Sequence, residues 1–400
     1  MKILYITSFF PFPLDTGGKL RVGNLMRQMS KRHEVYLAAL ELPEEDFGDE
    51  DLAEAKRYCR EVYTHYHPKS DKKAALGTLF TFSPYEINAF RDKAFSGKVA
   101  EMAQRIQPDV IWCSRLAATP FVPFDYPCLK VLDQHDLNSR LWGIMSHNAP
   151  SMAVRLFAHY NRLLVLRYER AMFPRFDVSI SVSETERQLT KTLVPGDFKT
   201  LTVANGVDTD HYRPLDEPHK PWCVLVGSMN QRRNADAACY FAHDMFPKVR
   251  AEHPGAQFYV VGRDPSPEVQ ALAQIDGVVI TGRVDDVRPY LNQAAVVVAP
   301  FRMGSGVKHK IPIAMSLGKA IVTTSNGCHG IAAENGVDAF IEDSPAAFSE
   351  RVCFLLSQQD FRKKMGAAAR KLVVSKYSWQ GLFEQLEHEI DHIRHAEHGR

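Results

Sequence analysis

Apolar and polar positions follow one another along the chain in a pattern that predicts strands and helices in alternation. Short apolar runs occur around Ile3, Val35, Ile111, Val131, Ile180 and Val203, and again around Val224, Val260, Ile280, Val297 and Val322. Their length and β-branched content are typical of strands buried on both faces of a parallel sheet. Because helical periodicity fills the segments between them, we expect two α/β units with doubly wound parallel sheets.

A stretch without periodicity separates the two series of strands. Residues 206–221 are rich in Pro, Asp and His, which is typical of a linker. We therefore expect an N-terminal domain over residues 1–205 and a C-terminal domain over residues 222–377. Residues 378–400 contain a long amphipathic helix whose apolar stripe needs a surface to pack on. Four hundred residues fit two domains of this size.

The segment FRMGSGVKHKIPIAMSLGKAIVTT, residues 301–324, combines a strand end, a glycine turn and a predicted helix over Lys308–Leu317. The residues of the turn are Gly304, Ser305, Gly306 and Val307. Free amide hydrogens, the positive end of a helix and the charge of Lys310 together predict an anion site, most naturally for phosphate. The alternative interpretation is an ordinary connection between a strand and a helix.

Other predicted strand ends carry glycines and cations. In the C-terminal half the first strand ends at Gly227, and Arg232 and Arg233 stand just before a helix. A guanidinium group stays charged and binds phosphate oxygens in pairs. Neighbouring parallel strands end at one sheet edge, so Arg233 and Lys310 predict a diphosphate site, with a solvated basic loop as the alternative. Val284, at another strand end, would lie where a loop can contact a nucleobase.

The N-terminal half has a second glycine turn. Gly17 and Gly18 stand between the first strand and a helix, but the turn is not the fingerprint GxGxxG, which argues against NAD and a dehydrogenase. His135 and Asp136 directly follow the strand around Val131. Taken alone, a histidine at this place has a structural interpretation as well as a catalytic one.

Composition excludes several classes of protein. Forty-nine basic against 47 acidic residues give a net charge of +2, so no field of the whole protein favours nucleic acid. Seven cysteines without a CxxC pair indicate neither a disulfide framework nor a zinc site, and we expect a reducing cytosol. The residues around Ile3 are interpreted as a strand rather than a signal peptide, and no apolar run is long enough to span a membrane.

The sequence offers little sign of a metal site. Asp208 and Asp210 form a literal DxD, but they lie in the linker, away from any predicted strand end. Divalent ions do bind paired carboxylates of this kind. We nevertheless favour a structural role and expect no metal and no other cofactor.

The segment SMAVRLFAHYNRLLVLRYERAMFPRF, residues 151–176, is helical by pattern and mixes cations with apolar side chains. Its arginines are Arg155, Arg162, Arg167, Arg170 and Arg175. A basic amphipathic helix can lie on an anionic bilayer, which makes contact with the inner membrane surface one hypothesis. The alternative is a surface helix packed on the sheet of a cytoplasmic protein.

Taken in order, several motifs resemble those of retaining glycosyltransferases with the GT-B fold and of the family 4 type, and most closely bacterial sugar transferases associated with exopolysaccharide gene clusters. The motifs are KILYITSFFPFPLDTGGKLR, VSISVSETE, TVANGVDTDHYRP, FYVVGRDPSPEVQAL, GVVITGRVDDVRPYL and GVKHKIPIAMSLGKAIVTT. The resemblance implies two Rossmann-like domains facing each other across a cleft. The N-terminal domain would be on the acceptor side, completed by the crossing helix at 378–400, and the C-terminal domain would bind the nucleotide sugar.

The resemblance also implies residue roles. Gly17 and Gly18 would offer amides to the donor phosphates or the acceptor, and His135 would lie beside the transferred sugar. Arg233 and Lys310 would bind the diphosphate leaving group. The donor, a nucleotide diphosphate sugar, is then a substrate, and the acceptor is a saccharide or lipid-linked saccharide.

The chain departs from the pattern of this family at three positions. Ser305 and Ile313 stand where the family has two glutamates, and Ser228 stands where it has an arginine. An isoleucine cannot bind ribose hydroxyls, so Ser305 or His309 would have to replace that contact. Two alternatives therefore stay open: a nucleotide-sugar-binding or scaffolding subunit with impaired catalysis, and a nucleotide-sugar epimerase of the same fold.

Overall fold

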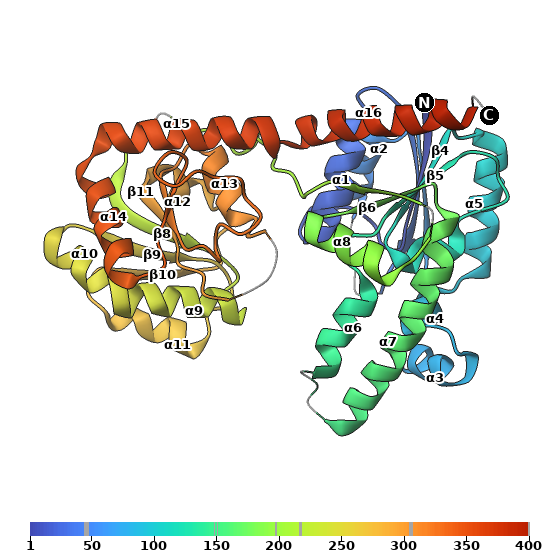
Figure 1. Ribbon diagram of the computed structural model, residues 1–400, viewed down its shortest axis with the longest axis horizontal. Coiled ribbons are helices and arrows are strands. Elements are labelled where there is room, and N and C mark those ends of the chain that lie inside the picture. The colour runs from blue at the N-terminus through green and yellow to red at the C-terminus, as the bar shows by residue number, and fades with distance from the viewer. Residues whose placement is uncertain are drawn as a thin grey trace. The chain divides into compact units, whose positions relative to one another are not determined.

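The computed structural model describes the chain except for a few short segments, and it divides the chain into two compact units (Figure 1). The residues outside the description are 44–47, 148, 150, 197, 216–217, 304–306 and 399–400, together with the side chains of 395–398. The first unit consists of Met1–Ala204 and Phe383–Arg400, and the second of Asn205–Leu382.

The first unit is built on a seven-stranded parallel sheet with the order β3-β2-β1-β4-β5-β6-β7. The strands are β1 Lys2–Thr7, β2 Glu34–Glu41, β3 Glu61–Tyr66, β4 Val110–Ser114, β5 Leu129–Asp133, β6 Val178–Ser181 and β7 Lys199–Thr202. In the register of the central strands, Ile3 pairs with Val35 on one side and Val110 on the other. The inner strands β1, β4, β5 and β6 are buried almost throughout, as their continuous apolar runs predict.

Helices cover this sheet and fill its core. They are α1 Gly17–Met29, α2 Asp49–Tyr58, α3 Asp71–Thr81, α4 Tyr85–Phe90, α5 Lys93–Ile106, α6 Asn138–His147, α7 Met152–Met172, α8 Glu184–Leu193 and 3-10 turns at Leu116–Phe121 and Phe173–Arg175. The predicted helix within residues 151–176 corresponds to α7. In the core, the ring of Phe95 on α5 meets that of Phe121 edge to face at 4.7 Å.

The C-terminal helix α16, Trp379–His398, packs against the first unit from Phe383 onward. Its stripe of Phe383, Leu386, Ile390 and Ile393 is buried. The ring of His33 lies 6.2 Å from that of Phe383, and Oε1 of Glu387 lies 2.7 Å from Nε2 of His33. The apolar stripe read from the sequence therefore has its packing surface in the first unit.

The second unit repeats the architecture with a six-stranded parallel sheet of order β10-β9-β8-β11-β12-β13. The strands are β8 Lys220–Val226, β9 Gln257–Val261, β10 Val278–Gly282, β11 Ala294–Ala299, β12 Ile321–Thr323 and β13 Phe340–Ile341. The helices are α9 Arg232–Tyr240, a π-turn at Phe241–Met245, α10 Phe246–Glu252, α11 Pro267–Ala271 followed by a 3-10 turn at Leu272–Gln274, α12 Arg288–Gln293, α13 Lys310–Ser316, α14 Pro345–Ser357 and α15 Gln359–Lys376. The prediction of an α/β chain with two parallel sheets is confirmed.

Some predicted elements were incomplete or displaced. The sequence pattern did not reveal β3, because this edge strand is half-exposed along its length and has no apolar run. It placed a strand around Val203, whereas β7 ends at Thr202. Helix α13 begins at Lys310 rather than Lys308. That start makes Pro312 the third helical residue, where no amide hydrogen is required, whereas the earlier start would have cost a hydrogen bond.

Replacing either of two helical glycines with alanine should change the stability of the protein in opposite directions. A Cβ at Gly366 in α15 would lie 1.9 Å from the carbonyl oxygen of Gly318, whereas a Cβ at Gly97 in α5 would meet nothing within 4 Å. We expect Gly366→Ala to lower the free energy of unfolding by about 1–3 kcal/mol through overpacking. Gly97→Ala should raise it by about 0.5–1 kcal/mol through helix propensity. Thermal unfolding of both variants measures this, and equal shifts would contradict the packing at Gly318.

Candidate functional site

Two glycines allow close contact between strand ends in the second unit. Gly227 follows β8, and a Cβ there would lie 2.7 Å from Nζ of Lys310 and 2.9 Å from the side chain of Asn234. Gly262 follows β9 with a φ of +151°, and its Cβ would lie 1.7 Å from the carbonyl oxygen of Gly227. Neither place has room for a side chain, so the backbone itself forms this part of the sheet edge.

The positively charged ammonium group of Lys310 lies at this edge. It is the first residue of α13, and its Nζ donates to Oδ1 of Asn234 at 3.2 Å. The side-chain amide of Asn234 in turn donates through Nδ2 to the backbone carbonyl of Ser228 at 2.8 Å. Burial, and then repulsion from Arg233, lower the pKa of Lys310 from 10.5 to about 8. Because Asn234 is neutral, its hydrogen bond orients the ammonium without balancing its charge.

Arg233 brings a second cation to the same edge. It is the second residue of α9, is exposed, and donates through Nη2 to Oε1 of Gln231 at 3.0 Å. Its charge is the second cause, after burial, of the lowered pKa of both Lys308 and Lys310. The guanidinium therefore lies within electrostatic range of both ammonium groups. An anion bound between them would relieve this repulsion.

The other predicted residues of the second unit occupy several settings. Val284 follows β10, and Val307 precedes α13; both are half-buried against the core. Gly304, Ser305 and Gly306 lie outside the described residues. Ile313, at the place of a family glutamate, also packs against the core.

Arg263 is a candidate that sequence reasoning missed. It follows β9, is exposed, and its Nε lies 3.4 Å from Oγ of Ser228, the position where the resembled family has an arginine. A guanidinium from the neighbouring strand thus reaches the place from which one is missing. The available signal was its position directly after the glycine that ends a strand.

In the first unit the structure brings Gly18 and His135 together. Gly18 lies in the first turn of α1, and a Cβ there would lie 3.9 Å from Nδ1 of His135. Gly17 has open space around it. The hydroxyl of the N-cap residue Thr16 accepts a hydrogen bond from the backbone amide of Lys19 at 3.4 Å. Both predicted elements therefore lie at the carboxyl edge of the first sheet, where α/β proteins bind ligands.

His135 is held in a fixed orientation. It is buried and has a φ of +55°, an unusual backbone conformation for a residue with a side chain. Its Nε2 lies 3.1 Å from Oγ of Ser114 and 3.5 Å from Oδ2 of Asp133. Burial lowers the pKa of His135 although the Asp133 carboxylate opposes this, so the neutral ring is favoured. A proton on Nε2 that faces Asp133 leaves Nδ1 free to accept a hydrogen bond on the side of Gly18.

A buried ion pair supports this histidine, and sequence reasoning did not identify it. Nε of Arg21 donates to both carboxylate oxygens of Asp133 at 2.9 Å, and Nη1 donates to the carbonyl of Val203 at 2.9 Å. Burial acts to raise the pKa of Asp133, but Arg21 and His135 outweigh it and hold this pKa well below its usual range. Asp133 is therefore ionised and positions the ring of His135.

Two groups of potential metal ligands lie away from the described strand ends. Oδ1 of Asp208 accepts the amides of Asp210 at 3.2 Å and His211 at 2.9 Å, so the DxD closes a turn. Within the described residues, one group of three metal-ligand types, Glu252, His253 and Cys353, has its ligand atoms within 4.8 Å of one another. These residues lie at the end of α10 and on α14, in the helical layer rather than at a strand end.

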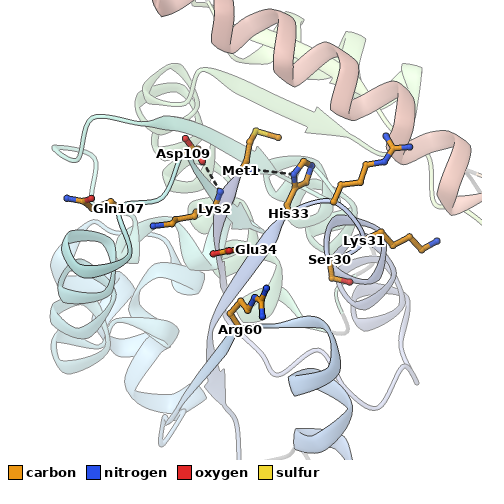
Figure 2. Close-up of a pocket in the computed structure, with 10 residues that line it drawn as sticks. Met1, Lys2, Ser30, Lys31, His33, Glu34, Arg60, Gln107 and Asp109 are labelled. Carbon is orange, nitrogen blue, oxygen red and sulfur yellow. Dashed lines mark hydrogen bonds between the residues drawn. The ribbon is translucent and has the colours of Figure 1, made fainter.

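The first unit also has an open hollow of about 660 Å³ at the amino ends of its strands (Figure 2). Lys2 and Lys31 extend to opposite sides of this hollow. The ammonium of Lys2 donates to the carbonyl of Ile106 at 3.1 Å, and Arg32 pairs with Glu387 at 2.5 Å. Since Lys2 and Lys31 diverge, since Lys2 and Arg32 are partnered, and since ligands bind at the opposite edge of such sheets, we assign no site to it.

Comparison with known proteins relates the second unit to a family. Residues 220–358, which include Gly227, Arg233 and Lys310, match the model of the family described as glycosyl transferases group 1. Over 405 aligned residues the chain is 18% identical to an uncharacterized 44.6 kDa protein in the cps region of Klebsiella pneumoniae, with 96% of this chain and 98% of that protein covered.

Solved structures resemble the whole chain. One is Anabaena Alr3699/HepE in complex with UDP and glucose, at 14% identity and a TM-score of 0.62, covering 98% of this chain and 99% of that chain. Another is sucrose-phosphate synthase from Thermosynechococcus elongatus, at 16% identity and a TM-score of 0.64, covering 99% of this chain and 100% of that chain. With the two parallel sheets described above, these likenesses show that the chain has the GT-B fold.

Proposed function

We propose that this protein is a glycosyltransferase that moves a sugar from a nucleotide diphosphate sugar to a saccharide acceptor, with retention at the anomeric carbon and without a metal ion. The observation that carries the proposal is the approach of Lys310 to Gly227 at the end of β8, within electrostatic range of Arg233. A partly buried ammonium that is hydrogen-bonded to a neutral amide and lies within electrostatic range of a guanidinium fits a diphosphate. The domain match over residues 220–358 supports the same reaction class.

The proposed mechanism is electrostatic. When the bond between the anomeric carbon and the diphosphate breaks, negative charge accumulates on the departing oxygen. Lys310 and Arg233 would stabilise this charge more strongly in the transition state than in the ground state, which is the condition for accelerating the step. Amides of the turn at 304–306, which lies outside the described residues, are proposed to add hydrogen bonds to the same group.

The first unit would supply the contacts on the sugar side. The neutral ring of His135, oriented by Asp133, would accept a hydroxyl proton through Nδ1 or face positive charge at the anomeric carbon. Gly17 and Gly18 leave backbone amides accessible to the donor phosphates or the acceptor. Val284 and Val307 are assigned to the nucleoside side. Retention rests on the resemblance in sequence alone.

The cellular setting is proposed from the relatives. The Klebsiella relative lies in a cps region, and the Anabaena relative was solved with UDP and glucose. The Anabaena protein supports a nucleotide-sugar donor, and the Klebsiella protein supports a role in exopolysaccharide or other cell-surface glycan synthesis. The acceptor would be a saccharide or lipid-linked saccharide, and the protein would work in the cytoplasm with membrane contact through residues 151–176.

A second candidate function is a nucleotide-sugar-binding or scaffolding subunit. Ile313 packs against the core and has no atom that can bind a ribose hydroxyl, which favours reduced catalysis. Arg263 favours the enzyme instead, because it supplies a cation next to Ser228. Release of nucleoside diphosphate from a panel of nucleotide sugars separates the two candidates.

Arg233→Ala should abolish most turnover without unfolding the protein. We expect the release of nucleoside diphosphate to fall by about 10²-fold or more, as when one preorganised donor is removed from a transition state. The matched control is Arg232→Ala, because Arg232 is the adjacent exposed cation on the same helix start. Both variants should keep the melting temperature of the wild type. Equal turnover in the two variants would remove Arg233 from the site.

The affinity for a nucleoside diphosphate should depend on the protonation of Lys310. The pKa of this lysine is about 8 in the folded protein, so its positive charge is present below pH 8 and is lost above it. Calorimetric titration with UDP should show affinity decreasing above pH 8, by at most about tenfold per pH unit. Lys310→Arg should remove this decrease, since guanidinium stays charged, and Lys310→Met should bind weakly throughout. A wild-type affinity that is flat to pH 9.5 would contradict the assignment.

A further inference from the structure

The large apolar side chains of helix α3 face solvent rather than the protein core. Leu76, Leu79 and Phe80 are 58%, 51% and 74% exposed, and their spacing places them on one face. The opposite face, which packs on the protein, carries Ala74 and Thr78, which are 2% and 0% exposed. A surface helix normally buries its large apolar residues and exposes its small and polar ones.

The neighbouring helices also expose large apolar side chains. On α6 the exposed residues are Leu141, Ile144 and Met145, and on α7 they are Met152, Leu156 and Leu163. The three residues of α7 recur at intervals of four and seven, so they form one stripe. Phe82, directly after α3, is 69% exposed. Exposed apolar patches of this extent usually mark a surface that another phase or molecule covers.

Direct contacts join these helices into one packed substructure of the first unit. The hydroxyl of Tyr160 on α7 donates to the carbonyl of Thr78 on α3 at 3.5 Å. The amide of Tyr85 donates to Oδ1 of Asn161 at 2.8 Å, and the ring of Trp142 on α6 lies 5.9 Å from that of Tyr85. Figure 1 shows α3, α4, α6 and α7 extending together from the sheet of this unit. We call this group the helical projection.

The helical projection is strongly basic, although the chain as a whole is nearly neutral. Residues 69–91 and 138–172 contain nine Lys and Arg but three carboxylates, whereas the net charge of the chain is +2. Each carboxylate is engaged: the Tyr85 hydroxyl donates to Asp71 at 2.6 Å, the Trp142 indole donates to Glu86, and Glu169 is buried. Asp71 is exposed and pairs with Lys69, and Arg140 pairs with Glu186 of α8, so positive charge exceeds negative charge around the apolar residues without being the sole charge there.

Charge and shape together select the occupant of this surface. A second protein could cover the apolar residues, but it would need an acidic face to meet the cations. An anionic bilayer offers both an apolar interior and a negative surface, and amphipathic basic elements bind it in this way. Among the described residues no helix is long and apolar enough to cross a bilayer, so contact would be at the interface.

We propose that α3 is the membrane-inserting element of this protein, and that the helical projection docks on an anionic lipid bilayer. Leu76, Leu79, Phe80 and Phe82 would enter the acyl boundary, while Lys72, Lys73 and the arginines of α7 would face lipid headgroups. This inference deepens the proposed function, on which it rests only for the lipid-linked nature of the acceptor. It adds α3 and α6 to the segment 151–176 named above.

Vesicle sedimentation of the full-length protein tests this inference. The probes are vesicles of phosphatidylcholine alone and vesicles with about one third phosphatidylglycerol. We expect binding to the anionic vesicles, weaker binding as salt is added, and little binding to the neutral ones. Leu79→Ser with Phe80→Ser should weaken binding at least tenfold, and so should Lys72→Glu with Lys73→Glu. The matched control is Val374→Ser on α15, which changes a residue 42% exposed in the second unit and should leave binding unchanged.

A second measurement reports insertion directly. Phe80→Trp keeps the apolar character of the position, and its fluorescence should shift to shorter wavelength and be quenched by brominated lipids in anionic vesicles. Absence of wild-type binding, or unchanged binding by the α3 variant, would overturn the inference. Self-association of the wild type that is lost in the Leu79→Ser, Phe80→Ser variant, without lipid binding, would show instead that this surface joins two copies. No donor is present in these assays, so their failure is distinct from that of the proposed transfer reaction.

Discussion

Burial of the Lys310 ammonium within range of a second cation, Arg233, is the electrostatic feature that distinguishes the carboxyl edge of the second sheet. Lys310 is partly withdrawn from water and lies within range of the Arg233 charge, and its lowered pKa reports both effects. The fold orients this ammonium with a neutral amide, Asn234, rather than with a carboxylate. A bound diphosphate would supply the missing negative charge. The arrangement is therefore least favourable when the site is free of ligand and becomes favourable with an anion of matching charge.

The first unit treats buried charge in the opposite way. Arg21 and Asp133 neutralise each other inside the protein, and the ion pair serves to fix the neighbouring His135. The neutral form of that ring is favoured by burial. One sheet edge thus carries an unbalanced positive charge and the other a neutral hydrogen-bonding group.

Both sheets and part of the candidate site could be predicted from the sequence, for physical reasons. Strands buried on both faces leave continuous apolar runs, so both sheets were predictable, whereas the half-exposed β3 has no such run. The proximity of Arg233 and Lys310 was predictable because β8 and β11 are neighbours. The pair of Arg21 and Asp133 was not, because 112 positions separate the two residues and neither has a local signal. The turn at 304–306 lies outside the described residues, and its role stays a prediction.

The exposed apolar face of helix α3 could not be predicted from the sequence, for a different reason. Its small buried residues and large exposed ones give almost the same composition as an ordinary helix, so only the packed structure reveals which face is turned outward. The arginines of α7 were visible in the sequence, but the apolar surface beside them was not.

The contact between Gly227 and Gly262 also limits how this fold can be diversified. A methyl group at residue 262 would overlap a main-chain oxygen of its neighbour, and every amino acid other than glycine carries at least that carbon. This part of the sheet edge is therefore closed to variation. If the proposed function holds, changes of donor preference, by natural divergence or by engineering, would have to come from surrounding side chains such as Val284, Val307 and Arg263.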